Sequence, residues 1–85
     1  MWSGNFEMSG AQWHVVGESF RWVYEQCLYY GKRFAYKHDD WLAIELCEDG
    51  KTRYYISVDP DVITIRNVRS DYAVCIRRNG GAWNV

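Results

Sequence analysis

The sequence predicts an α+β fold in which one amphipathic helix packs on a curved antiparallel sheet of about five strands. Two observations predict it. Apolar residues recur with a helical period from Phe20 to Gly31, and beyond Gly31 they alternate with a period of two. The apolar face of a helix must be buried, and a sheet with one apolar face is the surface available. A small half-open barrel is the variant that the pattern leaves open.

The chain has 85 residues, which predicts a single domain over residues 1–85. A chain of this length buries only about 60–65% of its unfolded surface, so its core must use few residues efficiently. Aromatic residues make up 18% of the chain, with five Trp and seven Tyr. Large rings fill a small core, and exposed rings anchor partners at interfaces, so both roles stay open.

Residues 1–17 include three glycines, and we expect little regular structure in this segment apart from a short strand over 12–16. Their rings, Trp2 and Phe6, are expected to fold back onto the domain.

Residues 19–30 are the predicted helix. Ser19 is the expected N-cap, and Gly31 stands where a glycine often ends a helix. Lys32 and Arg33 then follow the negative end of the helix dipole. The predicted buried face holds Phe20, Val23, Tyr24, Cys27, Leu28 and Gly31.

Period-two alternation predicts five strands, which cover 33–37, 41–48, 51–58, 62–68 and 72–78, with a short closing strand near the end of the chain. The predicted turns are Asp49-Gly50, Asp59-Pro60-Asp61, Arg69-Ser70-Asp71 and Asn79-Gly80. The residues expected to point into the core are Phe34, Tyr36, Leu42, Ile44, Leu46, Tyr54, Ile56, Val58, Ile63, Ile65, Val74 and Ile76.

The opposite face of this sheet is predicted to be basic, with four Arg and one Lys (Lys37) against one Glu (Glu45). Arginine pairs with phosphate in a bidentate manner, and exposed rings stack on bases. This face therefore predicts a small anionic, nucleotide-like ligand; the alternative is a solvated face held by cross-strand pairs. Its candidate binding residues are Arg33, Trp41, Arg53, Tyr55, Arg66 and Arg77.

Trp22 and Tyr29 form a second candidate site, because a spacing of seven places both rings on the solvent face of the predicted helix. An apolar patch of this kind is typical of a contact with a partner protein. Two alternatives remain open: the N-terminal segment covers the patch with Trp2 or Phe6, or a second copy of the chain buries it.

The net charge is −1, so no overall basic field attracts nucleic acid, and a nucleic-acid-binding module is kept only as the alternative function. The charge is uneven along the chain. Residues 1–50 carry four Lys and Arg against eight Asp and Glu, a net −4, whereas residues 51–85 carry six against three, a net +3.

No catalytic residue, metal site or cofactor is predicted. Cys27, Cys47 and Cys75 are widely spaced and form no Cys-x-x-Cys pair, and His14 and His38 accompany no nucleophile motif. No apolar run approaches the length of a membrane span, and the N-terminus lacks a signal pattern. These features predict a non-enzymatic cytoplasmic binding protein with reduced thiols.

The order of signals resembles a family of small phage proteins of the Thoeris anti-defence type. The resemblance rests on Phe20 to Leu28, the Gly31-Lys32-Arg33 run, Trp41 at the head of a strand and the tail Ala82-Trp83-Asn84-Val85. It covers residues 20–44 and the tail, and Ala82 stands where the family usually has an acidic residue. The resemblance implies a non-enzymatic inhibitor of bacterial immunity, which binds a host protein or sequesters a nucleotide-derived signal. It assigns no ligand-binding residue.

Overall fold

The structure is a computed structural model that describes residues 1–8, 11–38, 41–70, 72–79 and 82–83. The described elements are one helix, α1 (Phe20–His38), and the strands β1 (Trp2–Met8), β2 (Ala11–Gly17), β3 (Leu42–Glu48), β4 (Lys51–Val58), β5 (Val62–Asn67), β6 (Ala73–Asn79) and β7 (Ala82–Trp83).

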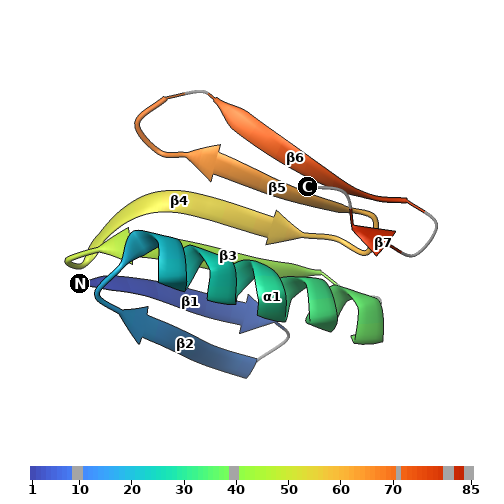
Figure 1. Cartoon of the computed structure of the whole chain (residues 1–85), viewed down its shortest axis with the longest axis horizontal. Helices are drawn as coiled ribbons and strands as arrows, with labels where there is room; N and C mark the ends of the chain where they lie inside the picture. Colours follow the sequence, from blue (N-terminus) through green and yellow to red (C-terminus); the bar gives the residue numbers. More distant parts are fainter. Residues whose placement is uncertain (9–10, 39–40, 71, 80–81, 84–85) are drawn as a thin grey trace.

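Six strands form one open antiparallel sheet in the order β2-β1-β3-β4-β5-β6, and the two residues of β7 pair with the end of β6 (Figure 1). The predicted α+β class, with one helix packed on an antiparallel sheet, is confirmed. The order is linear from β2 to β7, so the described strands form an open sheet and not a closed barrel.

The N-terminal segment supplies two strands where one was predicted. The expected strand over 12–16 is β2, and β1 inserts between β2 and β3, with Asn5 opposite both His14 and Glu45. Phe6 of β1 is buried and packs edge-on against Trp13 of β2, with ring centroids 5.2 Å apart. The N-terminal hairpin is therefore part of the core.

The helix is longer than predicted, so the expected end at Gly31 and the expected strand over 33–37 are both wrong. Gly31 does not cap α1; it faces the sheet, where a Cβ would lie 3.1 Å from Val58 Cγ2. The apolar period continues through Phe34 and Ala35, and Ala35 is completely buried. The start of the helix is as predicted, since the Ser19 hydroxyl accepts a hydrogen bond from the Trp22 N–H at 3.3 Å.

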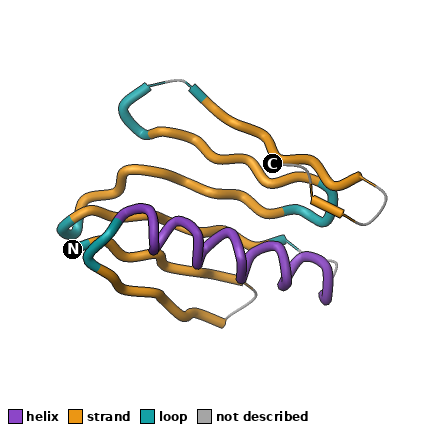
Figure 2. The backbone as a smooth tube through the Cα atoms, viewed as in Figure 1, coloured by secondary structure: helices purple, strands orange, loops and turns teal. Residues whose placement is uncertain are grey.

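The core lies between α1 and one face of the sheet. α1 packs on β1, β2, β3 and β4, whereas β5 and β6 extend beyond it (Figures 1 and 2). Of the residues expected to point inward, Tyr36 is instead exposed, and Phe34 and Tyr54 are half-buried. Val74 lies on the expected side of the sheet, opposite Ile65, but is 42% exposed. The expected residues that are buried are Leu42, Ile44, Leu46, Ile56, Val58, Ile63, Ile65 and Ile76.

The Asp49-Gly50 hairpin is confirmed: the two residues have φ values of 49° and 81°, as a type I′ turn requires. The Asp59 N–H bonds to the Val62 carbonyl at 2.9 Å and closes the turn between β4 and β5. The predicted turns at Arg69-Ser70-Asp71 and Asn79-Gly80 lie partly outside the described residues.

Candidate functional site

A groove of about 410 Å³ runs between the C-terminal half of α1 and the edge strand β2. We call it the helix–β2 groove. Four aromatic rings and two cationic side chains line it: Trp13, Tyr30, Arg33, Phe34, Tyr36 and Lys37.

The groove exists because the helix continues past Gly31. Tyr30 precedes Arg33 and Phe34 by three and four residues, and Lys37 follows them by four and three, so the four residues lie along one flank of α1. This flank stands beside β2 and faces Trp13 across the groove. A helix that ended at Gly31 would have supplied only the first of these four side chains.

The core holds the rings of the groove in place. Trp13 lies against Phe34 with centroids 6.0 Å apart and a 44° angle between the ring planes. Beneath them, the buried Phe6 contacts Trp13 at 5.2 Å and Tyr30 at 6.5 Å. Three of the four rings, Trp13, Tyr30 and Phe34, are therefore positioned before any ligand arrives, which lowers the entropic cost of binding, whereas Tyr36 is 68% exposed.

Arg33 is oriented by a neutral partner. Its Nη1 donates a hydrogen bond of 2.7 Å to the Tyr29 hydroxyl, and its guanidinium carbon lies 5.3 Å from the centre of the Tyr29 ring. A phenol does not neutralise the guanidinium, so its charge remains available to an anion. The ion pairs found among the described residues involve neither Arg33 nor Lys37.

Trp22 and Tyr29 lie on the outer side of α1, as predicted, and are 48% and 50% exposed. The N-terminal segment covers Trp22 only from one side, where the Trp22 ring lies against Gly17. A Cβ added to Gly17 would come within 2.7 Å of Trp22 Cε3. Neither predicted cover residue reaches the patch: Trp2 packs against another ring at the start of α1, and Phe6 is buried in the core.

The predicted basic sheet face is not present as a unit. Arg33 and Lys37 belong to α1, on the other side of the sheet, because the predicted strand over 33–37 is helical. Tyr55, Arg66 and Arg77 do share the outer face, where Tyr55 and Arg66 are cross-strand neighbours.

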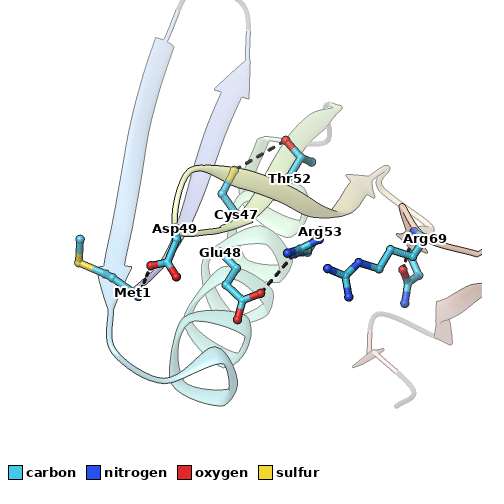
Figure 3. A network of polar contacts seen from close by, with 8 residues as sticks. Met1, Cys47, Glu48, Asp49, Thr52, Arg53 and Arg69 are labelled. Atoms are coloured by element: carbon cyan, nitrogen blue, oxygen red, sulfur yellow. Dashed lines mark hydrogen bonds and ion pairs between the residues drawn. The ribbon is translucent and has the colours of Figure 1, made fainter.

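Arg53 was also predicted on the outer face, and a β-bulge displaces it. The pairing of β3 with β4 shifts between Leu46 and Cys47, so Arg53 has no cross-strand partner in β3. Its Nε donates to a Glu48 carboxylate oxygen at 3.2 Å (Figure 3). The side chain lines a small hollow with Trp2, on the helix side of the sheet.

Trp41 is half-exposed immediately before β3. It precedes Glu45, the cross-strand neighbour of Tyr55, by four residues.

The outer face carries charges of both signs. A hollow of about 580 Å³ lies over β1, β2 and β3 and is lined by Glu7, His14 and Glu45, among others. Arg66 lies on β5, separated from Glu45 by Tyr55 of β4, and Arg77 lies on β6. A phosphate backbone laid across the whole face would meet repulsion at Glu7 and Glu45, so this geometry gives the nucleic-acid alternative little support.

The buried thiols are poorly suited to nucleophilic chemistry. Burial raises the pKa of Cys27 to about 12. Burial, and then the hydrogen bond to Glu45, also raises the pKa of Cys47. Both thiols are therefore protonated at neutral pH, whereas a reactive cysteine needs a lowered pKa. Cys75 is exposed on β6.

Comparison of the chain with protein-family models, with curated proteins and with solved structures finds no match. The resemblance to phage anti-defence proteins therefore stays a prediction. Within the described ranges, no group of three or more His, Cys, Asp or Glu side chains is placed to hold a metal ion. Over the same ranges, no helix has both the length and the apolar character needed to cross a bilayer.

Proposed function

We propose that this chain is a non-enzymatic binding protein that holds an anionic, ring-bearing ligand of the nucleotide type in the helix–β2 groove. One observation carries the proposal: the groove combines preplaced aromatic rings with Arg33 and Lys37. A base stacks on the rings, and the phosphates pair with the two cations. The groove volume of about 410 Å³ lies within the range of small-molecule sites.

The lining of the groove offers stacking surfaces and positive charge, which are features that bind a ligand of this kind. We extend the proposal to the biological role that the family resemblance implies, in which a mobile-element protein inhibits host defence by sequestering a signal of this chemistry.

Isothermal titration with ADP, and with adenosine as the uncharged counterpart, tests the proposal. We expect ADP to bind and adenosine to bind at least about tenfold more weakly, because charge-assisted hydrogen bonds contribute about 1.5–3 kcal/mol. Arg33→Gln and Lys37→Gln should each weaken ADP binding by about tenfold.

Lys51→Gln is the matched control. Lys51 is also exposed and cationic, but it lies in the β3–β4 hairpin, at the opposite end of α1 from the groove (Figure 1). The proposal fails if adenosine binds as tightly as ADP, or if Lys51→Gln weakens binding as much as the groove variants do.

A further inference from the structure

The strand β6 lies at the edge of the sheet and is only partly covered. The described residues of β7 pair with Arg78 and Asn79 alone. From Ala73 to Arg77, the side of β6 that faces away from β5 therefore has no partner among the described strands. An edge of this kind is a template for the addition of another strand.

The hydrogen-bond pattern identifies which backbone groups point to this edge. The backbone N–H of Asn67 donates to the Tyr72 carbonyl, and the backbone N–H of Arg78 donates to the Asp61 carbonyl. Both bonds join β6 to β5. Since backbone groups alternate in direction along an antiparallel strand, Val74 and Ile76 also bond toward β5. The backbone N–H and C=O groups of Ala73, Cys75 and Arg77 therefore point to the open edge.

An apolar groove adjoins the edge on the helix side of the sheet. α1 packs on β1 to β4 (Figure 1), and on the helix side of β6 Val74 is left 42% exposed, whereas Ile76 is buried. The groove has a volume of about 310 Å³, and its lining residues are Phe20, Tyr24, Tyr54, Ile65, Asn67, Tyr72 and Val74. Two of them remain widely accessible, with Tyr72 71% and Val74 42% exposed. An added strand would bury apolar side chains here.

The surroundings of the edge are cationic. Arg66 and Arg77 are exposed near β6, and none of the ion pairs found among the described residues involves them. Residues 51–85 carry six Lys and Arg against three Asp and Glu. A partner strand with carboxylates on its outer side would complement these charges, whereas a second copy of β6 would bring another Arg77 to the same edge.

We propose that the β6 edge is a docking site for an extended segment of a partner protein in which apolar and acidic residues alternate. The segment adds a strand beside Ala73–Arg77, which places its apolar side chains next to Val74 and its acidic ones next to Arg77. Main-chain hydrogen bonds provide affinity, and the groove and the arginines provide specificity. The site lies apart from the helix–β2 groove, so it stands or fails independently of the ligand proposed there.

Amide hydrogen exchange with a short peptide of alternating valine and glutamate tests the proposal directly. We expect saturable binding, with slower exchange of the Ala73 and Cys75 amides and little change at Val74, which already bonds to β5. A peptide of alternating valine and lysine is the matched probe and should bind at least about tenfold more weakly.

Two variants separate edge pairing from charge. Cys75→Pro removes an edge N–H without removing a bond to β5, and it should abolish peptide binding. The exposed double variant Arg66→Glu with Arg77→Glu should lower affinity more than tenfold and keep the wild-type melting temperature. Lys51→Glu is the charge control and should bind as the wild type does. The double variant remains informative if the proline variant does not fold.

Three results would overturn the proposal: no saturable binding of the glutamate peptide up to about millimolar concentration, equal binding of the lysine peptide, or undiminished binding by the double variant. A dimer in size-exclusion chromatography that Cys75→Pro dissociates would also overturn it, because a second copy would then occupy the edge.

Discussion

Small residues set the distance between α1 and the sheet. Gly4 lies in the middle of β1 directly beneath the buried Cys27, and a Cβ added to Gly4 would collide with the Cys27 sulfur. Further along the helix, a Cβ added to Gly31 would lie in tight contact with Val58, 3.1 Å from its Cγ2. Close approach at these points explains why glycine occupies a strand and a helix, where it otherwise costs stability.

We expect Gly4→Ala to lower the free energy of unfolding by about 1–3 kcal/mol, because the added methyl group overpacks the core at Cys27. Urea denaturation checks this value. In a double-mutant cycle, Gly4→Ala should cost much less in the Cys27→Ala background, where the sulfur is absent. Equal costs in the two backgrounds would contradict the contact.

The three thiols should differ in reactivity. In native protein at neutral pH, iodoacetamide should modify the exposed Cys75 rapidly and Cys27 only on unfolding, since burial raises the pKa of Cys27 to about 12. Between pH 9.0, the ordinary thiol pKa, and about pH 12, Cys27 is ionised in the unfolded chain and protonated in the native protein. The free energy of unfolding should therefore fall as the pH rises through this range. Peptide mass mapping of the modified sites checks the order, and rapid native labelling of Cys27 would contradict it.

The sequence could predict single-residue positions only where the secondary structure was assigned correctly. Trp22, Tyr29, Tyr55, Arg66 and Arg77 lie on the sides of their elements that were expected. Arg33 and Arg53 do not, for different physical reasons. Arg33 is helical because Gly31 does not end α1, and Arg53 is displaced by a β-bulge that strict alternation cannot anticipate.

At the scale of elements, Gly31 was ambiguous. A glycine on the buried face of a helix can end it or can permit close packing on a sheet, and local sequence does not distinguish the two. The continuing period was present in Phe34 and Ala35, three and four residues beyond Gly31. The burial of Ala35 in the core shows that packing on the sheet decides the matter.

The first strand was missed because Gly4 concealed its pattern. Trp2, Gly4, Phe6 and Met8 occupy one face of β1, but a glycine interrupts the apolar alternation that predicts a strand. The Ser9-Gly10 pair that follows is a turn signal, and together with the strand over 12–16 it would have predicted a hairpin.

Capping should contribute measurably to the stability of α1. Ser19→Ala removes the acceptor of the Trp22 N–H and should lower the free energy of unfolding by about 1 kcal/mol. Thermal denaturation should show this as a decrease of about 4–8 °C in Tm. Ser19→Asp retains a capping oxygen and should melt near the wild type. If Ser19→Ala and Ser19→Asp lose the same stability, the cap is not the cause.

At the scale of the whole molecule, one helix covers part of a broad sheet and leaves two different surfaces beside it. On one flank, α1 and β2 enclose aromatic rings with Arg33 and Lys37. On the other, β5 and β6 extend past the helix and present an apolar groove and an open edge. Neither surface could be predicted from the sequence, since each depends on where the helix ends and which strands it covers.

The indole N–H signals of the tryptophans provide the most direct test of the proposed ligand site. Trp13 lines the helix–β2 groove, whereas Trp22 lies on the outer side of α1 against Gly17. In a titration followed by ¹H–¹⁵N NMR, saturating ADP should shift the Trp13 indole signal and the backbone signals of Arg33 and Phe34, and leave the Trp22 indole signal in place. A binding isotherm at Trp22 with no change at Trp13, or no saturable shift at either ring, would contradict the account.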